Sequence, residues 1–320
     1  MTEKEKRKIS MLAEVATMYY ERGLTQNEIA EILCVSRTSV SRMLTAAAEK
    51  GIIQVHINYQ FERHYELERQ ITERFPVKNV YVLNNRGKNQ REIAFGTSSL
   101  AAGVLQKALR PDMTIGVTWG NTLSDVIDCL ESPSIVPDGI EVIQLTGAVP
   151  KENPVGCSQT IVSKLSEKLS GCPRFLNAPL LVKNAQLRSA LKEEPNNAKV
   201  LRRAEFCDVV LTGVGLCSDP ELRNFGSYMT KAYGDEILQK GGIGSICGRF
   251  FDREGRELNC GWNRELIGID LAELKRIPNV FCVSYEPQKA PAIRAVLQGK
   301  LVDTLVTDGT TATKMLNLTR

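Results

Sequence analysis

The chain shows two different patterns of apolar positions, one in its first fifty residues and another from about residue 77 onward. In the first part, apolar residues recur only at helical spacing, three or four positions apart. In the second part, short apolar runs typical of buried strands alternate with helical stretches. Such alternation favours a mostly parallel sheet with helices on both faces. We therefore predict a small helical unit followed by a doubly wound α/β domain.

Three helices are predicted before residue 50, at 9–20, 26–33 and 37–49. Each has its apolar residues on one face, and a glycine follows the first and the third. The next residues alternate in polarity over 52–58 and predict a strand that could form a wing.

Capping residues mark the beginnings of the second and third helices. Thr25 with Glu28 three residues later forms a capping box, and Ser36 is a second N-cap. Two short helices joined by a tight turn are the helix-turn-helix pattern. The alternative is a small helical bundle with polar outer faces.

Polar residues gather near the beginning of the third helix, where a helix docked in the major groove meets base edges. Arginine can form two hydrogen bonds to guanine, and hydroxyl groups reach bases or phosphates. We therefore predict double-stranded DNA as a partner. The candidate DNA-binding residues are Thr25, Gln26, Ser36, Arg37, Thr38, Ser39, Ser41 and Arg42.

A charged helix is predicted over 61–75, with Leu67 and Ile71 on one side. It is either a plain linker or, as we favour, a dimerisation helix, because helix-turn-helix units usually act as symmetric dimers. The predicted organisation is a winged helix-turn-helix DNA-binding domain at 1–59, a linker or dimerisation helix at 60–76, and an effector-binding and oligomerisation domain at 77–320.

Glycine-containing loops follow several predicted strands of the larger part. Ligands of parallel sheets bind beyond the carboxyl ends of the strands. In the loop at 115–122, Gly120 lets the backbone approach a ligand, and free amides at the helix that follows favour an anion. Lys289 could add the positive charge that a phosphate needs, although a solvated surface lysine is the alternative. One such loop is often purely structural, but the set together indicates a binding site.

The composition is that of an ordinary globular protein, with 42% hydrophobic and 24% charged residues. The net charge is +4, and the first sixty residues hold eight Lys or Arg against seven Asp or Glu. This balance permits DNA binding without arguing for it. There is no apolar run of about 20 residues, and the first residues are mixed in charge and lack an apolar signal region. We expect a cytoplasmic protein.

Nine cysteines are scattered singly, without a C-x-x-C pair. This pattern predicts buried, reduced thiols rather than disulfides or a metal site. The only histidines are His56 and His64. We predict neither a metal nor a cofactor.

Four segments in this order carry a likeness to a known family. They are residues 19–30, residues 35–42, Gly116-Val117-Thr118-Trp119-Gly120 and Cys247-Gly248-Arg249-Phe250-Phe251-Asp252. Over essentially its whole length the chain resembles the SorC (DeoR-like sugar-binding) family of bacterial transcription regulators. The resemblance implies a winged helix-turn-helix joined to an effector domain related to glucosamine-6-phosphate deaminase and similar sugar-phosphate isomerases. It also implies a phosphorylated sugar or related metabolite as effector, and a repressor that acts on DNA as a homo-oligomer, a dimer or a homotetramer.

The resemblance further implies the positions of an effector site. They are Thr118, Trp119, Gly120, Asn121, Thr122, Thr146 and Gly147 on the phosphate side, and Gly215, Ser245 and Lys289 on the sugar side. Members of the family commonly have Asp where Ser245 stands. Some deoxyribose-phosphate-responsive relatives have Lys at the position of Thr146, where it forms a Schiff base. Thr146 can only hydrogen-bond, so a covalent effector is disfavoured.

Two other classes of function remain as alternatives. The first is a sugar-phosphate isomerase or deaminase with an added DNA-binding domain. The deaminase relatives use a histidine just after a glycine loop, but no histidine follows Gly213-Val214-Gly215 in this chain. We therefore predict that the protein is not an enzyme. The second is a constitutive DNA-binding protein whose large domain only oligomerises, against which the glycine-rich loops argue.

Overall fold

The computed structural model describes residues 3–20, 22–53, 62–131, 138–149, 156–218 and 223–318. The chain divides into two compact units, residues 1–60 and 61–320. The strand predicted over 52–58 lies mostly outside the described residues.

The smaller unit consists of three helices: α1 (Glu3–Tyr20), α2 (Gln26–Ile32) and α3 (Arg37–Glu49). The three predicted helices are confirmed, although α1 begins six residues earlier than the apolar spacing indicated. Their apolar faces meet in a small core of Val15, Met18, Ile29, Ala30, Val40 and Leu44.

The predicted caps fix where α2 and α3 begin. The Thr25 hydroxyl accepts from the Glu28 amide at 3.3 Å, and the Glu28 carboxylate accepts from the Thr25 amide at 2.8 Å. The Ser36 hydroxyl accepts from the Ser39 amide at 3.1 Å. These bonds satisfy amides that a helix leaves unpaired at its beginning, so each substitution to Ala is worth roughly 1 kcal/mol of stability.

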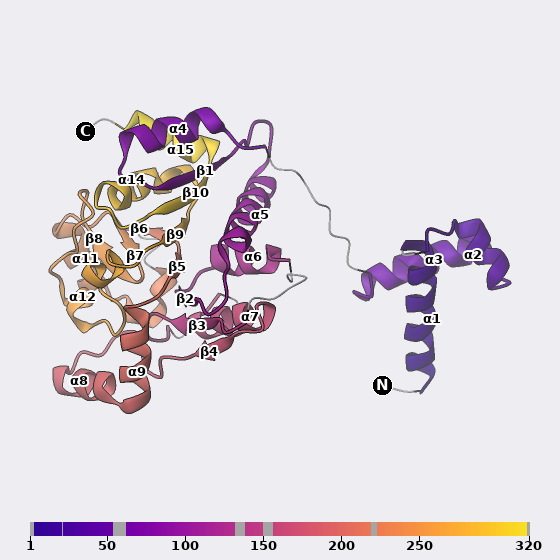
Figure 1. Ribbon diagram of the computed structural model, residues 1–320, viewed down its shortest axis with the longest axis horizontal. Coiled ribbons are helices and arrows are strands. Elements are labelled where there is room, and N and C mark those ends of the chain that lie inside the picture. The colour runs from indigo at the N-terminus through magenta and orange to yellow at the C-terminus, as the bar shows by residue number, and fades with distance from the viewer. Residues whose placement is uncertain are drawn as a thin grey trace. The chain divides into compact units, whose positions relative to one another are not determined.

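A seven-stranded sheet forms the centre of the larger unit (Figure 1). Its strands are β1 (Asn79–Leu83), β2 (Thr114–Val117), β3 (Glu141–Gln144), β4 (Cys172–Arg174), β5 (Val209–Thr212), β9 (Val280–Val283) and β10 (Thr304–Asp308). They lie in the order β1-β10-β9-β5-β2-β3-β4, and every neighbouring pair is parallel. After β2 the chain builds outward to β4 and then returns to place β5 on the other side of β2. This reversal opens a crevice at the carboxyl ends of β2 and β5.

Helices cover both faces of this sheet. On one face lie α5 (Gln90–Ala108), α6 (Asn121–Cys129) and α7 (Ser158–Lys168), and on the other lie α4 (Tyr65–Arg74), α9 (Pro195–Ala204), α14 (Ala290–Gln298) and α15 (Gly309–Asn317). Successive strand residues point to opposite faces, as Val142 and Ile143 do. Because both faces are buried, the strands are continuous apolar runs.

A three-stranded antiparallel sheet and several short helices complete the larger unit. The strands are β6 (Val214–Leu216), β7 (Gly244–Ile246) and β8 (Arg249–Phe251). The helices are α8 (Ala185–Glu193), α11 (Lys231–Gln239), α12 (Gly261–Glu265), α13 (Leu271–Leu274) and the 3-10 turns η1 (Arg223–Tyr228) and η2 (Pro287–Lys289). None of these elements, and neither β4 nor α9, was predicted from the sequence. The strands have only three residues each, too few to establish a period.

The segment at 60–76, predicted as a linker or a dimerisation helix, lies almost wholly in the larger unit, which begins at Phe61. Its helix, α4, packs against β1 and lies beside α15 (Figure 1). The buried Glu68 carboxylate accepts from the Val82 amide of β1 at 2.9 Å and from two nitrogens of Arg63 at 2.9 and 2.6 Å. A carboxylate that caps the free edge of a strand has a partner distant in sequence, which helical spacing does not reveal.

The cysteines are less uniformly buried than predicted. Cys207, Cys247, Cys260 and Cys282 are buried, three others are half-buried, and the prediction is wrong for the exposed Cys34 and Cys172. Cys34 lies in the turn between α2 and α3, with a φ of 52°. Burial raises the pKa of the Cys247 thiol to about 12, so it stays protonated. Among the described residues, no helix has the length and apolar character to cross a membrane.

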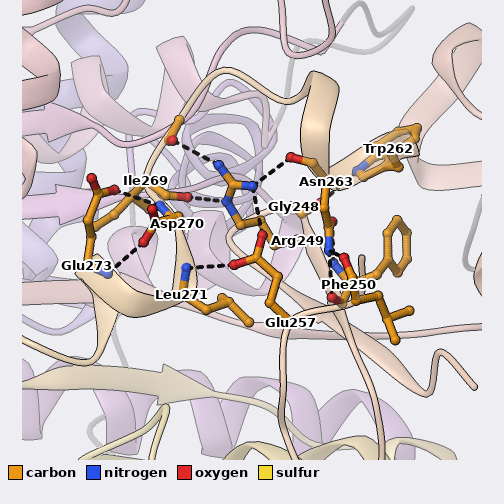
Figure 2. Close-up of polar contacts among 12 residues, drawn as sticks. Gly248, Arg249, Phe250, Glu257, Trp262, Asn263, Ile269, Asp270, Leu271 and Glu273 are labelled. Atoms are coloured by element: carbon orange, nitrogen blue, oxygen red, sulfur yellow. Dashed lines mark hydrogen bonds and ion pairs between the residues drawn. The ribbon is translucent and has the colours of Figure 1, made fainter. Parts of the chain in front are cut away.

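Arg249 of β8 holds the irregular part of the larger unit together (Figure 2). Its guanidinium donates to the carbonyls of Ile269, Asn263 and Gly268 at 2.6, 2.8 and 3.2 Å. It also binds the Glu257 carboxylate at 2.9 Å. One buried side chain thereby supplies donors to two backbone segments, at Asn263 and at Gly268–Ile269.

We expect Arg249→Ala to lower the free energy of unfolding by about 3–5 kcal/mol, because it removes the ion-pair partner of Glu257 and leaves three buried carbonyls without their guanidinium donor. The Arg249 side chain is 7% exposed. The matched control is Arg256→Ala, whose side chain is 71% exposed and pairs with Asp252 and Glu254. The control is expected to cost under about 1 kcal/mol. Urea denaturation of both variants measures the difference, and equal losses would contradict the assigned role of Arg249.

Candidate functional site

A cavity of about 390 Å³ lies where the loops after β2, β5 and β9 meet β6 and β7. This is the crevice at which the strand order of the sheet reverses. Its volume is in the range of small-molecule sites. Of the residues predicted from the sequence, it brings together Thr118, Trp119, Gly120, Asn121, Thr122, Gly215, Ser245 and Lys289.

The beginning of α6 forms one end of the cavity. Gly120 has a φ of 138°, a backbone conformation that favours glycine, and its amide donates to the Gly156 carbonyl at 2.9 Å. Because the N-cap residue is Gly120, α6 begins without a side-chain cap from that position. Amides at a helix beginning, together with the helix dipole, form a site for an anionic group.

A cluster of aromatic side chains packs behind the part of the cavity wall that Trp119 forms. The Trp119 ring lines the cavity and lies edge-on to Phe225, with 5.9 Å between ring centroids. Phe225 packs in turn on the buried Trp262 at 4.8 Å, and the Trp262 indole donates to the Gly248 carbonyl at 2.8 Å. A side chain at Gly248 would place its Cβ 2.7 Å from the Trp119 ring. Gly248 therefore leaves the Trp119 ring the space that it occupies.

Gly215 and Ser245 face each other across the β6–β7 pair. A Cβ at Gly215 would lie 2.7 Å from the Ser245 hydroxyl oxygen, so glycine leaves that hydroxyl its space. Ser245 is 7% exposed and lines the cavity. Its hydroxyl offers one donor and two acceptor sites to a bound molecule.

Several ionisable side chains line the rest of the cavity. The Lys289 ammonium lies 2.9 Å from the Glu286 carboxylate. Burial raises the pKa of the Tyr285 phenol, and its hydrogen bond with Thr122 opposes part of that shift. Burial and the nearby Asp128 raise the pKa of Asp125. The described charged lining groups are thus two carboxylates and one ammonium.

Thr146 and Gly147 do not line this cavity, contrary to the expectation from the resemblance. They continue β3 as an extended segment in which the Gly147 amide donates to the Ile267 carbonyl. A Cβ at Gly147 would lie 2.3 Å from the Pro179 carbonyl oxygen, so this glycine permits two backbones to approach. Packing rather than ligand contact accounts for Gly147, and Thr146 is fully buried.

The cavity is also lined by residues that were not predicted as site residues: Leu123, Asp125, Gly213, Val214, Leu216, Phe225, Cys247, Gly248, Val283, Tyr285 and Glu286. Gly213, Val214, Cys247 and Gly248 belong to segments already singled out in the sequence. Phe225 had no such signal, because it lies in η1, between elements without a recognisable period.

The candidate DNA-binding residues all lie at the beginnings of α2 and α3. Arg37, Thr38, Ser41 and Arg42 are exposed on α3. Ser36 and Ser39 engage each other at the cap, with 2.9 Å between their hydroxyl oxygens. Thr25 is exposed and engaged in the capping box, and Gln26 is partly exposed. Thr25, Gln26 and Arg37 line one shallow surface hollow.

Comparison with known proteins places the chain in a family. Residues 59–317 match the family model Sugar-bind, described as a "putative sugar-binding domain". The chain belongs to this family. The LsrR transcriptional regulator of Escherichia coli (strain K12) is 32% identical over 308 residues, which cover 95% of this chain and 94% of that protein. The deoxyribonucleoside regulator of Bacillus subtilis (strain 168) is 26% identical over 315 residues, covering 98% of this chain and 99% of that protein. The resemblance to the SorC (DeoR-like) family is thus confirmed.

Solved structures show the same fold. The full-length sorbitol operon regulator SorC from Klebsiella pneumoniae matches with a TM-score of 0.75 and 24% identity, over 97% of this chain and 99% of that one. A transcriptional regulator from Streptococcus pneumoniae TIGR4 matches with a TM-score of 0.74 and 26% identity, over 79% of this chain and 96% of that one. The predicted mixed α/β fold with a mostly parallel sheet is confirmed. The relatives are named as regulators and not as enzymes, in agreement with the predicted class.

We expect Gly248→Ala to move the Trp119 ring, because the new methyl group would overlap it. The matched control is Gly241→Ala: the two glycines have φ values of 76° and 78°, but a Cβ at Gly241 meets nothing within 4 Å. Both variants carry the cost of Ala at positive φ, somewhat over about 1 kcal/mol. Only Gly248→Ala is expected to shift tryptophan fluorescence toward longer wavelength. An unchanged spectrum would contradict the packing of Trp119 on Gly248.

Proposed function

We propose that this protein is a DNA-binding transcription regulator whose operator affinity is controlled by a phosphorylated sugar or a similar phosphorylated metabolite. The observation that carries the proposal is the cavity at the reversal point of the sheet, with the uncapped beginning of α6 at one end. Relatives that match nearly the whole chain are named as transcription regulators, which supports the regulatory part.

The smaller unit is proposed to read DNA. Helices α2 and α3 with the turn between them form a helix-turn-helix, to which the residues after α3 would add a wing. Arg37, Thr38, Ser41 and Arg42 are exposed along the first turns of α3, which is the part of a recognition helix that meets base edges. Thr25 and Ser36 cap the N-termini of α2 and α3 with their side chains. Their proposed contribution to DNA binding is indirect, because they fix where the first backbone amides of these helices could meet phosphates.

The larger unit is proposed to bind the effector. A phosphate would accept from the amides at the beginning of α6, while Ser245 and Lys289 reach the rest of the molecule. The placement of the site beyond the strand ends supports the expected relation to sugar-phosphate isomerases and deaminases.

The proposed mechanism is a shift between two populated arrangements of a homo-oligomer, a dimer or a tetramer. An effector changes DNA affinity only through its different affinity for the two arrangements. The loops around the cavity connect strands at the centre of the sheet to β6 and β7, so ordering them links the cavity to the rest of the unit. Subunit contacts that move with these loops would alter the spacing of the two recognition helices.

We expect phosphorylated sugars, each tested beside its unphosphorylated form, to raise the melting temperature selectively. A ligand at about 100 times its dissociation constant adds roughly 2.7 kcal/mol. Gly120→Asp is expected to abolish this shift, since a carboxylate would stand at the anion site, while DNA affinity is retained. Gly87→Asp is the control, because its glycine also has positive φ and open space but lies outside the cavity. A shift from the free sugar alone would contradict the anion site.

We expect Arg37→Ala to weaken binding to the matched operator by about 1–3 kcal/mol if Arg37 reads a guanine. Fluorescence anisotropy with a selected operator and with random DNA compares the two affinities at fixed salt. Lys50→Ala is the control, because Lys50 is exposed at the end of α3, far along the helix from Arg37. An equal loss on both DNAs would make Arg37 a phosphate contact instead.

A further inference from the structure

Glu286 stands out among the residues around the cavity because of its backbone. Its φ is 84° and its ψ is 118°, a combination that residues with side chains rarely adopt. The other described non-glycine residues with positive φ have smaller values, between 46° and 59°. Backbone strain of this kind persists where the surrounding structure imposes it, and it collects at binding sites.

The strained conformation places the Glu286 carboxylate against the only described ammonium of the cavity lining. Its Oε2 lies 2.9 Å from the Lys289 Nζ, one turn further along the chain. The Lys289 side chain is 16% exposed and the Glu286 side chain 40%. Lys289 is therefore shielded from water and already paired, with its partner at the open side of the cavity.

This pairing has a consequence for an anionic ligand. Among the described lining residues, Asp125 and Glu286 are acidic and Lys289 is basic. An anion that approaches Lys289 must take the place of the Glu286 carboxylate or lie beside it. The free energy of the existing ion pair is therefore subtracted from the affinity for the incoming charge.

We propose that Glu286 is a specificity-determining residue of the effector site, acting as an internal counter-ion that competes with the ligand's anionic group for Lys289. The inference rests on the proposed function and deepens it. Weakly held anions fail to displace Glu286, whereas a ligand that also binds the α6 amides and Ser245 succeeds. Glu286 thus makes occupancy depend on the whole ligand rather than on its charge alone.

The test compares the affinity of the full chain for inorganic phosphate with that of Glu286→Gln. Gln keeps the size of the side chain and removes its charge. Isothermal titration at fixed ionic strength is expected to show a dissociation constant about tenfold lower in the variant, equivalent to about 1.4 kcal/mol. The matched control is Glu73→Gln, which makes the same change in net charge at an exposed position of α4. There Glu73 pairs with Arg69. The control is expected to leave the affinity unchanged, and melting curves check that both variants are folded.

The possible results separate this proposal from the proposed function. Phosphate binding by the wild-type chain that is unchanged or weaker in Glu286→Gln overturns the role of Glu286 and leaves the anion site standing. An equal gain in Glu73→Gln also overturns it, because the effect would then come from overall charge. Binding of phosphate by neither the wild type nor Glu286→Gln overturns both the competition and the anionic part of the proposed function. A gain in Glu286→Gln alone supports both.

Discussion

The parallel pairing of all seven strands of the central sheet is the constraint on which the rest of the structure depends. Parallel strands need a crossover between each pair, so the chain must cover both faces with helices. It also brings every strand's carboxyl end to one edge. Because the order reverses between β2 and β5, two crossovers leave that edge in opposite directions and open the crevice that becomes the cavity.

The crevice alone would be too open to bind a small molecule, and the irregular segments after β5 close it. These segments have few backbone ladders, so side chains supply their missing hydrogen bonds. Arg249 binds carbonyls of two of these segments, and the Trp262 indole donates to the Gly248 carbonyl. Trp119 rests on that support. The position of the cavity wall therefore depends on the buried hydrogen bonds behind it.

Two residues of the cavity lining, Cys247 and Glu286, have positive φ without being glycine. Such conformations cost of order 1–3 kcal/mol each and persist only where packing outweighs them. Cys247 is fully enclosed, so packing explains its conformation. Glu286 is half-exposed, and its ion pair with Lys289 is the contact that accompanies the strain.

The sequence by itself determined the elements whose signals are local. Capping at Thr25 and Ser36 and the apolar periods placed α2 and α3 within a few residues, because those signals depend on neighbours three or four positions away. The glycine-containing loops after β2 and β5 were recognisable for the same reason, and eight of the residues predicted for the site line the cavity. Only the tertiary structure decided which of these loops meet. It removed Thr146 and Gly147 from the cavity, brought Phe225 into it, made α4 part of the larger unit through Glu68 and Val82, and paired Lys289 with a strained Glu286. Each of these outcomes depends on contacts between distant segments or on a backbone conformation fixed by packing, and neither leaves a periodic trace in the sequence.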